Sequence, residues 1–459
     1  MKDTIAIVGG GFSGSLTAFH LVQEGVDARV IVIDPAPRLG LGLAYSTPSS
    51  RHLLNVPAGK ISALPKKPNH FVEWLKAHSD EAFSAEDFVP RAVFGKYVQS
   101  LLARTRGIEH VRSTAVGCRV VGEKAILRLE HGEELAADAV VLATGNFPSA
   151  TLPGVSERAR AAGTYSDLPW EASTYAKLTP DATVALIGSG LTAVDVLLRL
   201  RELGHCGPVK MVSRTGVLPR RHERYQRLSR PAIEKKHPKR ASELLALVHS
   251  AIRSGSPWRA VIDSLREVTN ELWLSLPLHE QKRFRRHLQR RWDVVRHRMA
   301  PGVADCIATE LAAGSLQVIA GRVLAIDGDE SGATVTIRAA HGSEGKNERM
   351  LDQRLPAARV INCTGPNMNY TQLGSPLLDS LFSQGLISAG PHGSGLWSNR
   401  EGALRKEDGL FSNILFNIGP GRQGVLLESI AVPELREQAA DLAQVLRCRL
   451  SDLREERIA

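Results

Sequence analysis

The stretch TIAIVGGGFSGSLTAFHLVQEG, Thr4–Gly25, decides the fold. It begins with an apolar run that predicts a β-strand, passes through Gly9-x-Gly11-x-x-Gly14, and continues with the apolar spacing of a helix. Glycine is needed at these three positions because the turn is tight, the backbone must approach a pyrophosphate, and the helix must pack on the strand. Free N–H groups at the start of the helix then favour an anion. The stretch therefore predicts a dinucleotide-binding βαβ unit.

The next strand, RVIVID, ends at Asp34, 20 residues after Gly14. A carboxylate at this position accepts hydrogen bonds from the ribose of a dinucleotide. The glycine spacing alone occurs by chance, and a glycine-rich turn without a ligand is the alternative, but strand, helix and acid agree here. The predicted nucleotide contacts of this first unit are Gly9, Gly11, Phe12, Ser13, Gly14 and Asp34.

The same pattern returns in TVALIGSGLTAVDVLLRLRELG, Thr183–Gly204. Its motif is Gly188-x-Gly190-x-x-Ala193, in which alanine is an allowed third residue. Placing Gly188 on Gly9 aligns the two units without a gap and puts Ser213 at the position of Asp34. Two units predict two dinucleotides. The predicted contacts of the second loop are Gly188, Ser189, Gly190, Leu191 and Thr192.

The second unit replaces the acid with Ser213 and Arg214, in the stretch MVSRTG. A carboxylate there would repel a 2′-phosphate, whereas a guanidinium binds one through two hydrogen bonds. We therefore expect NADPH rather than NADH, with Arg220 and Arg221 as further phosphate contacts. The alternative is that Arg214 is an ordinary surface arginine and that NADH binds without an acidic clamp.

Two strands that end in a Thr-Gly pair mark the expected domain crossings. ADAVVLATGNFP ends in Thr144 and Gly145, and ARVINCTGPN ends in Thr364 and Gly365. We expect an α/β protein with two Rossmann-like domains, the second inserted in the first. The first domain comprises residues 1–160 and 355–459, and the second comprises 161–354, with a helical excursion at about 220–300. The expected inner positions of this excursion are Val261, Leu265, Leu272 and Leu276.

Composition excludes several classes of protein. With 459 residues, 43% apolar and 23% charged, the chain suits a soluble globular protein of two domains. No apolar run reaches the ~18 residues of a membrane span, and the N-terminus does not resemble a signal peptide, so we expect a cytoplasmic protein. The five cysteines lie far apart, which argues against zinc spacing, a disulfide framework and the dithiol-dependent disulfide reductases.

Positive charge is concentrated between Lys210 and Arg298, which hold 22 Lys and Arg against 8 Asp and Glu. A nucleic-acid surface would add interleaved aromatic residues or a recognition motif, and the sequence shows neither. The preferred interpretation is a solvated helical surface with a phosphate-binding corner. No nucleic-acid or membrane partner is expected.

Four longer stretches are more specific than the glycine loops: LGLGLAYSTPSSRHLLNVPAG (39–59), FVPRAVFGKYV (88–98), RRWDVVRHRMAP (290–301) and GRQGVLLESIAVPELREQA (421–439). With them, nearly the whole chain resembles a bacterial group of FAD/NAD(P)-binding flavoproteins related to class B flavin-dependent monooxygenases. The resemblance implies FAD in the first domain and NADPH in the second. The Baeyer–Villiger signature FxGxxxHxxxWP is absent, and YSDLPW (165–170) stands in its place, which disfavours ring oxygenation.

The resemblance also assigns residues to the flavin. Gly42, Ala44, Tyr45, Asn55 and Val56 would lie along it, Arg91 and Tyr97 would lie near its ribityl or pyrophosphate part, and Gly419 and Gly424 would bring the last helix towards the ring. The alternatives are core packing for Tyr45, Tyr97 and Phe94, and a turn before Pro57 for Asn55.

The function that the resemblance implies is NADPH-dependent oxygenation of a small soluble substrate, such as the N-hydroxylation of an amine or amino acid, with O2 as the oxidant. Hydride transfer requires no side-chain nucleophile, which agrees with a chain that has no such motif. The alternatives are a reductase or dehydrogenase that passes electrons to an organic or protein acceptor, and a non-catalytic dinucleotide sensor. Conceivable proton donors are His52, His70, His222 and His297.

Overall fold

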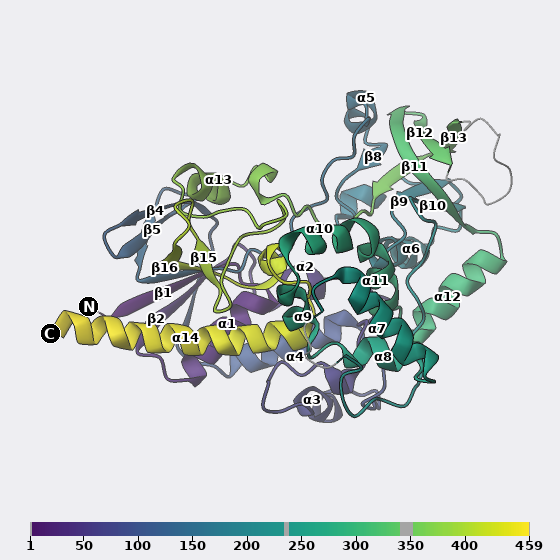
Figure 1. Cartoon of the computed structure of the whole chain (residues 1–459). Coiled ribbons are helices and arrows are strands. Elements are labelled where there is room, and N and C mark those ends of the chain that lie inside the picture. Colours follow the sequence, from purple (N-terminus) through teal and green to yellow (C-terminus); the bar gives the residue numbers. More distant parts are fainter. Residues whose placement is uncertain (1, 234–237, 340–351, 459) are drawn as a thin grey trace.

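The computed structural model describes residues 2–233, 238–339 and 352–458. Figure 1 shows two α/β lobes, with a group of helices between them that lies close to the start of the long C-terminal helix. Each lobe is built on its own sheet, and a smaller sheet of three strands accompanies the first. This is the two-domain α/β arrangement that the repeated glycine motif predicts.

The first sheet combines strands from both ends of the chain. Its strand order is β15 (Ala403–Arg405), β16 (Phe411–Asn417), β7 (Ala139–Leu142), β1 (Asp3–Val8), β2 (Ala28–Ile33) and β3 (Ile108–Val111). The strands from β16 to β3 are parallel. Because β15 and β16 follow the second nucleotide unit in the sequence, the sheet confirms that the second lobe is inserted in the first.

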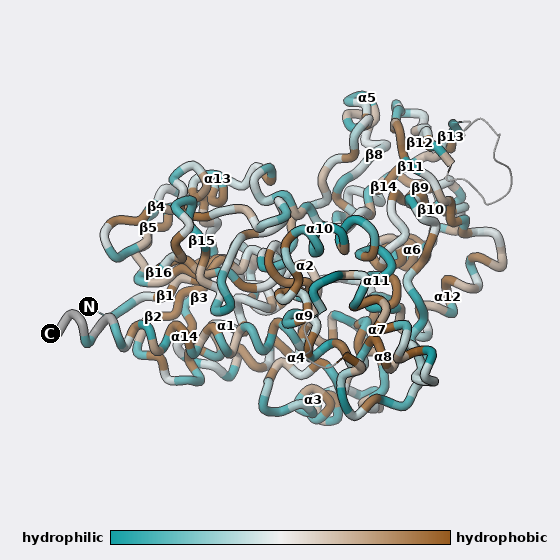
Figure 2. Tube along the Cα trace, in the orientation of Figure 1, coloured by the Kyte–Doolittle hydropathy of each residue, from teal (hydrophilic) through white to brown (hydrophobic). Residues whose placement is uncertain are grey.

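Both faces of the first sheet are covered, as parallel sheets require. Ile5 and Ile7 of β1 belong to a core that includes the helices α1 (Phe12–Gln23), α4 (Arg91–Ala103) and α14 (Val432–Ile458). Ala6 and Val8 face the other core, which β4 (Ala115–Val121), β5 (Lys124–Leu129), β6 (Glu134–Ala137) and α13 (Pro376–Ser383) complete. In Figure 2, α14 alternates between hydrophilic and hydrophobic colours, as expected of a helix with one buried face.

The second sheet has seven strands, in the order β13 (Asp352–Ala357), β12 (Gly332–Ala339), β11 (Leu316–Asp329), β10 (Val209–Ser213), β9 (Val184–Ile187), β14 (Arg359–Asn362) and β8 (Tyr165–Ser166). Helices α6 (Leu191–Glu202) and α12 (Pro301–Ala312) share a core with one face, and α5 (Glu157–Ala161) packs on the other. Because β13 and β14 belong to this sheet, the chain leaves it after Asn362 and not at about residue 355.

The helical excursion lies between β10 and α12. It comprises α7 (Ala241–Arg253), α8 (Trp258–Ser264), α9 (Thr269–Ser275), α10 (Leu278–His287) and α11 (Gln289–Arg296). The four expected inner residues, Val261, Leu265, Leu272 and Leu276, are all buried. The interpretation of its positive charge as solvated is partly wrong, because Arg296 and Arg298 are buried and paired with carboxylates.

Shorter helical segments complete the two lobes. They are α2 (Gly42–Tyr45), η1 (Ala58–Lys60), α3 (His70–His78), η2 (Ala172–Tyr175), η3 (Tyr370–Gln372) and η4 (Gly419–Gly424). Over the ranges that the structure describes, no helix combines the length and apolar character that crossing a bilayer would take. Within the same ranges, His, Cys, Asp and Glu side chains form no group suited to a metal ion.

Candidate functional site

The first glycine loop connects β1 to α1 so closely that side chains are excluded. Gly9 has a φ of +108°, and a Cβ there would lie 2.2 Å from the carbonyl oxygen of Ala143. A Cβ on Gly14 would lie 2.0 Å from the carbonyl oxygen of Gly9. Gly11 caps α1 in an extended conformation without any side-chain hydrogen bond, so the first N–H groups of the helix receive no side-chain cap. The loop and helix end fit the pyrophosphate of a dinucleotide.

Asp34 lies directly beside this loop, as its position in the sequence predicts. Its carboxylate accepts hydrogen bonds from the backbone N–H of Gly10 at 2.6 Å and of Ala36 at 2.8 Å. These two donors fix the carboxylate at the carboxyl end of β2, next to the glycine loop.

The segment that contains α2 lies over the glycine loop. The N–H of Gly40 donates to the carbonyl of Gly10 at 2.8 Å, and a Cβ on Gly42, whose φ is +51°, would lie 3.1 Å from the Cα of Gly11. Ala44 is exposed. Tyr45 packs on Phe12 and Phe94, with ring centroids 5.8 and 4.9 Å apart, so its contacts are those of the packing alternative.

The C-terminal glycines reach the same helix end from the other side. Gly419 has a φ of +82°, and a Cβ there would lie 3.0 Å from the hydroxyl of Ser13 in the first turn of α1. The hydroxyl of Ser429 donates to the carbonyl of Gly419 at 2.7 Å and holds η4 in place. Gly424 lies further along η4, where a Cβ would be 2.2 Å from the carbonyl oxygen of Ser394. The structure therefore brings together the first glycine loop, Asp34, Gly42 and Gly419.

Other predicted flavin residues form contacts within the protein. Arg91 makes an ion pair with Asp195 of α6 at 2.8 Å, which joins α4 to the second nucleotide unit. The Tyr97 hydroxyl lies 2.9 Å from Nδ1 of His70 and accepts a hydrogen bond from the Ala63 N–H at 3.3 Å. Burial raises the pKa of Tyr97 to about 12.

Two of the candidate histidines join the lobes. His52 donates from Nε2 to the carbonyl of Asp195 at 2.9 Å, so its Nδ1 accepts from the Thr47 hydroxyl at 2.7 Å. His222 donates from Nε2 to the carbonyl of Asn55 at 3.0 Å. Burial lowers the pKa of His52, and burial together with nearby Arg298 lowers that of His222 to about 3. Both rings donate to backbone carbonyls, which is the contact expected of a structural histidine.

The second glycine loop repeats the geometry of the first. Gly188 has a φ of +123°, and a Cβ there would lie 2.3 Å from the carbonyl oxygen of Cys363, which corresponds to Ala143 in the first unit. Gly190 caps α6 without a side-chain hydrogen bond. The Ser189 hydroxyl donates to the Ser213 hydroxyl at 2.8 Å, and Ser213 also accepts from the Gly216 N–H at 3.1 Å. Arg214 and Arg220 are exposed nearby in the chain.

Arg290 is a second cation at this loop, and sequence reasoning did not select it. It comes from α11 and donates from Nη2 to the Ser189 hydroxyl at 3.0 Å and to the Val217 carbonyl at 2.6 Å. A Cβ on Gly190 would lie 3.9 Å from its Nη1. Burial lowers its pKa, and Asp293 opposes that effect. The available signal was its place in the RRWDVVRHRMAP stretch, inside the basic region.

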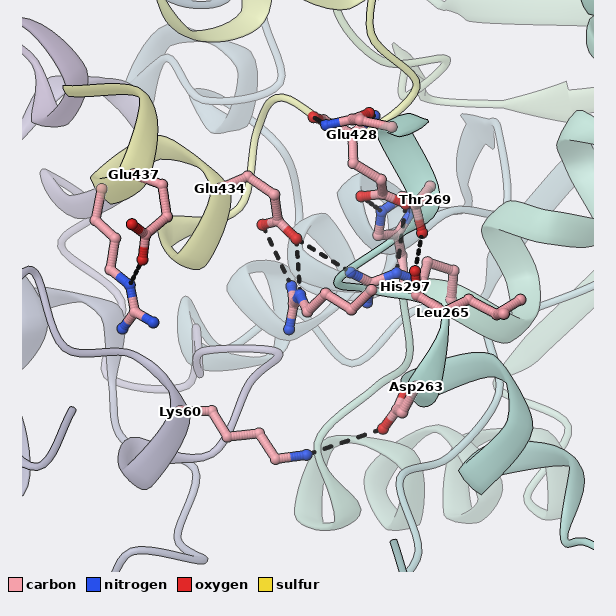
Figure 3. Close-up of polar contacts among 12 residues, drawn as sticks. Lys60, Asp263, Leu265, Thr269, His297, Glu428, Glu434 and Glu437 are labelled. Atoms are coloured by element: carbon pink, nitrogen blue, oxygen red, sulfur yellow. Dashed lines mark hydrogen bonds and ion pairs between the residues drawn. The ribbon is translucent and has the colours of Figure 1, made fainter. Parts of the chain in front are cut away.

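A large charged cavity separates the helical excursion from the start of α14. Its volume is about 1440 Å³, and α8, α9, the 398–401 segment and α14 contribute to its walls. In Figure 3, Lys60 points towards Asp263 across this region, and Glu434 and Glu437 extend from the start of α14. The charged side chains that line it include Lys60, Asp263, Arg266, Arg422, Glu434, Arg436 and Glu437.

Two of these cations are perturbed by burial. Burial lowers the pKa of Lys60 to about 8, although Asp263, 3.9 Å away, acts in the opposite direction. Burial likewise lowers the pKa of Arg422 to about 10. The Arg422 guanidinium donates from Nη2 to the carbonyls of Asn399 and Arg400, while its buried Nε has no hydrogen-bond partner. The cavity thus offers donors and carboxylates to a polar, charged molecule.

Glu428 connects the excursion to the segment that follows η4. Trp292 donates to its carboxylate at 3.1 Å, and Arg296 and His297 lie 3.3 and 3.7 Å from it. Asn270 binds its backbone on both sides, with hydrogen bonds of 2.8 and 3.0 Å. Burial by itself raises the pKa of Glu428, but Arg296 and His297 hold it at about 2. Figure 3 shows His297 and Glu428 within this cluster.

Known proteins resemble the chain at two levels. The model of a family described as FAD-NAD(P)-binding matches residues 6–147, which contain the first glycine loop, Asp34 and Thr144. The uncharacterized protein YdhS of Escherichia coli is 25% identical over 42% of this chain and 38% of its own length. The ferredoxin–NAD(+) reductase subunit of a benzene 1,2-dioxygenase system from Pseudomonas putida is 26% identical over 44% and 40%. The chain thus matches about two fifths of the length of these curated relatives.

Solved structures match almost the whole chain. The ornithine hydroxylase PvdA from Pseudomonas aeruginosa, in its reduced form, has a TM-score of 0.64 and 18% identity, and covers 98% of this chain and 100% of its own. The L-lysine 6-monooxygenase from Pseudomonas syringae has a TM-score of 0.66 and 14% identity at the same coverage. At these identities the likeness shows the fold, which the chain shares with these two enzymes over almost its whole length.

Proposed function

We propose that the chain is an NADPH-dependent FAD oxidoreductase that oxygenates a small polar substrate. The observation that carries the proposal is the pair of equivalent glycine loops, each at a helix end without a side-chain cap, with Asp34 beside one and arginines beside the other. The family match over residues 6–147 supports FAD in the first lobe. The ornithine hydroxylase and the L-lysine 6-monooxygenase of similar fold support the monooxygenase class.

Each lobe would position one dinucleotide. The start of α1 and Asp34 would bind the pyrophosphate and ribose of FAD, with η4 close to the same helix end. The start of α6, Arg290 and Arg214 would bind the phosphates of NADPH. When bound, FAD supplies the redox chemistry, accepting a hydride from NADPH and passing the electrons on. The protein aligns the two nucleotides, and the Arg91–Asp195 and His222–Asn55 contacts hold the lobes in one orientation.

The charged cavity is the proposed substrate site. Its walls carry side chains of both signs, which suits an amine or amino acid, because cation and carboxylate would each meet an opposite charge. Arg422, which lines the cavity, would supply positive charge to an anionic group of the substrate. Lys60, whose pKa lies at about 8, can change its protonation state within the ordinary working range of an enzyme.

A second candidate is a reductase that transfers electrons to another acceptor without inserting oxygen. The Pseudomonas putida relative, a reductase subunit for a ferredoxin, favours it. The five cysteines of the described residues are all free thiols. A reductase of this kind would therefore pass its electrons on without a disulfide relay.

Anaerobic stopped-flow reduction followed by mixing with oxygen distinguishes the two candidates. We expect the purified protein to retain or take up FAD and to be reduced faster by NADPH than by NADH. With an amine or amino acid that fits the cavity, a hydroxylated product should form for each NADPH consumed. If all electrons appear as peroxide across a broad panel of amines while an artificial acceptor is reduced efficiently, the reductase is correct. Failure to bind FAD would reject both candidates.

The NADPH preference has its own test, because Arg214 is exposed and contributes only to the 2′-phosphate. An Arg214→Ala variant should lose about 0.2–1 kcal/mol of NADPH affinity, the usual worth of an exposed ion pair. NADH affinity should stay constant. Equal losses of affinity for both nucleotides would show that Arg214 is an ordinary surface arginine that does not recognise the 2′-phosphate.

A further inference from the structure

The helical excursion encloses a second cavity, of about 290 Å³, which the proposed redox reaction does not use. Helices α7 to α11 form its walls, together with Ile233 before α7 and Leu427 of the segment after η4. Helices α8 and α9 separate it from the charged cavity, because Ile262 and Leu272 face the second cavity whereas Asp263 and Glu271 face the first. We call it the apolar cavity, because aliphatic and aromatic side chains make up most of its lining.

Tryptophan is concentrated around the apolar cavity. Three of the six tryptophans of the chain, Trp258, Trp273 and Trp292, line it, together with Phe284. Ring T-stacking of Trp273 and Phe284, with centroids 5.6 Å apart, builds one wall. Flat aromatic walls offer large contact area to an apolar molecule and lose little conformational entropy on binding.

Three polar groups of the walls are already engaged. Trp273 donates from Nε1 to the Val425 carbonyl at 2.9 Å, and Trp292 donates to the Glu428 carboxylate at 3.1 Å. The Thr269 hydroxyl donates to the Leu265 carbonyl of the preceding turn at 2.7 Å. No lining side chain is among the buried polar groups that lack a partner in the described residues. A hydrogen-bonding group of a ligand that lies against the aliphatic and aromatic part of the lining would stay unsatisfied, so this part of the cavity selects against polar molecules.

The same hydrogen bonds make the cavity preformed. Both indoles are fixed at their N–H edges by the segment Val425–Glu428, which belongs to the first lobe, so the rings cannot easily turn inward. Helix α7 closes the cavity with Leu244 and Val248, both only half-buried, while Leu247 on the same helix is exposed. A binding site that already has its bound shape avoids the entropy cost of forming it.

The volume limits the size of the ligand. An engineered apolar cavity of about 150 Å³ binds benzene. The apolar cavity has about twice that volume, which corresponds to two fused or linked aromatic rings or an aliphatic chain of similar bulk. We propose that it binds a small neutral organic molecule of this kind, with few hydrogen-bonding groups, at a site separate from both nucleotides.

The neutral fluorescent probe N-phenyl-1-naphthylamine tests this proposal with the full-length, FAD-loaded protein. We expect saturable binding of one probe per chain and a loss of tryptophan emission, because the wall tryptophans transfer energy to a probe in contact with them. A Leu244→Trp variant fills the cavity and should weaken binding at least tenfold. A Leu247→Trp variant adds the same side chain outside the cavity on the same helix and should bind as the wild type does.

Two results would overturn the proposal: binding that does not saturate, or equal probe affinity in the two variants when both melt cooperatively. If Leu244→Trp does not fold, Val248→Leu, which adds one methylene to the same wall, replaces it and should still weaken the probe. Because the readout is probe binding, failure of NADPH to reduce the flavin would leave this result unaffected.

Discussion

The two nucleotide units share one backbone geometry and differ in the side-chain contact between the glycine loop and the end of the second strand. Gly9 and Gly188 both lie against a carbonyl of the neighbouring strand, at 2.2 and 2.3 Å from a Cβ placed on each. In the first unit the Gly10 N–H donates to Asp34, and at the equivalent positions of the second unit the Ser189 hydroxyl donates to Ser213. The link between loop and strand end is thus kept while the negative charge is removed. We infer that the shared backbone geometry serves both nucleotides and that the side chain at the end of the second strand selects between them.

The units also differ in the segment that follows their second strand. In the first unit it folds back as α2, α3 and α4 over its own glycine loop. In the second unit the excursion reaches the other lobe, where Trp273 binds Val425, Arg285 binds the Gln423 carbonyl at 2.7 Å and Arg266 binds Glu434 at 2.7 Å. The second excursion thus adds several charged contacts between the lobes to the single Arg91–Asp195 ion pair, which joins α4 of the first segment to α6.

Breaking this coupling should give the largest effect. Glu428→Gln keeps an acceptor for Trp292 but leaves Arg296 and His297 without its charge, and removing one partner of a buried ion pair costs about 3–5 kcal/mol of unfolding free energy. Urea unfolding at pH 7 measures this loss. Glu267→Gln, on an exposed residue of the same excursion, should change stability by less than about 0.5 kcal/mol.

The effect of Glu428→Gln should also depend on pH. The pKa of Glu428 falls from 4.5 to about 2 on folding, so its carboxylate stabilises the folded state fully above pH 4.5 and loses this contribution as the pH falls towards 2. The difference between wild type and variant should therefore be constant from pH 7 to pH 5 and shrink below that. A difference that stays unchanged at pH 3 would contradict the assigned charge.

The two units differ at the third position of the glycine motif, which is Gly14 in the first unit and Ala193 in the second. Gly14→Ala places a Cβ 2.0 Å from the Gly9 carbonyl oxygen, so the backbone must shift, at a cost of ~2–3 kcal/mol and with loss of FAD affinity. The second unit has Ala193 at this position, buried without such a clash, and Ala193→Gly should cost only about 1 kcal/mol through helix propensity. Thermal unfolding and flavin retention measure both. Similar losses in the two variants would show that the helices approach their strands equally closely.

The local parts of this comparison were predictable from sequence, and the long-range parts were not. Strand, glycine turn, helix and Asp34 follow one another within one supersecondary unit, so spacing sufficed to find them. Arg290 meets Ser189 from 101 residues away, and Glu428 meets Trp292 across 136 residues, and no periodicity encodes such pairs. The expected boundary at 355 falls inside β13, because only the long-range pairing of β13 with β12 shows to which sheet this segment belongs.

Arg290 is the cation that reaches the second glycine loop from a distant part of the sequence. Arg290→Ala removes a guanidinium held at the glycine loop by Ser189 and Val217, so NADPH affinity should fall by the ~1.5–3 kcal/mol of a charge-assisted hydrogen bond. FAD affinity should not change, because no equivalent cation contacts the first loop among the described residues. Fluorescence titration with each nucleotide gives both values. Arg286→Ala, exposed on α10, is the matched control and should leave both unchanged.

Ser213→Asp would give the second unit the acidic residue of the first. The new carboxylate can accept the hydrogen bonds that Ser189 and the Gly216 N–H now donate to Ser213, so the fold should tolerate it. It would repel a 2′-phosphate but accept bonds from an unphosphorylated ribose, and we expect NADPH affinity to fall about tenfold, or ~1.4 kcal/mol, while NADH affinity holds or improves. If NADPH affinity does not change, the charge at the end of β10 does not select the nucleotide, and Arg290 alone would account for the difference between the units.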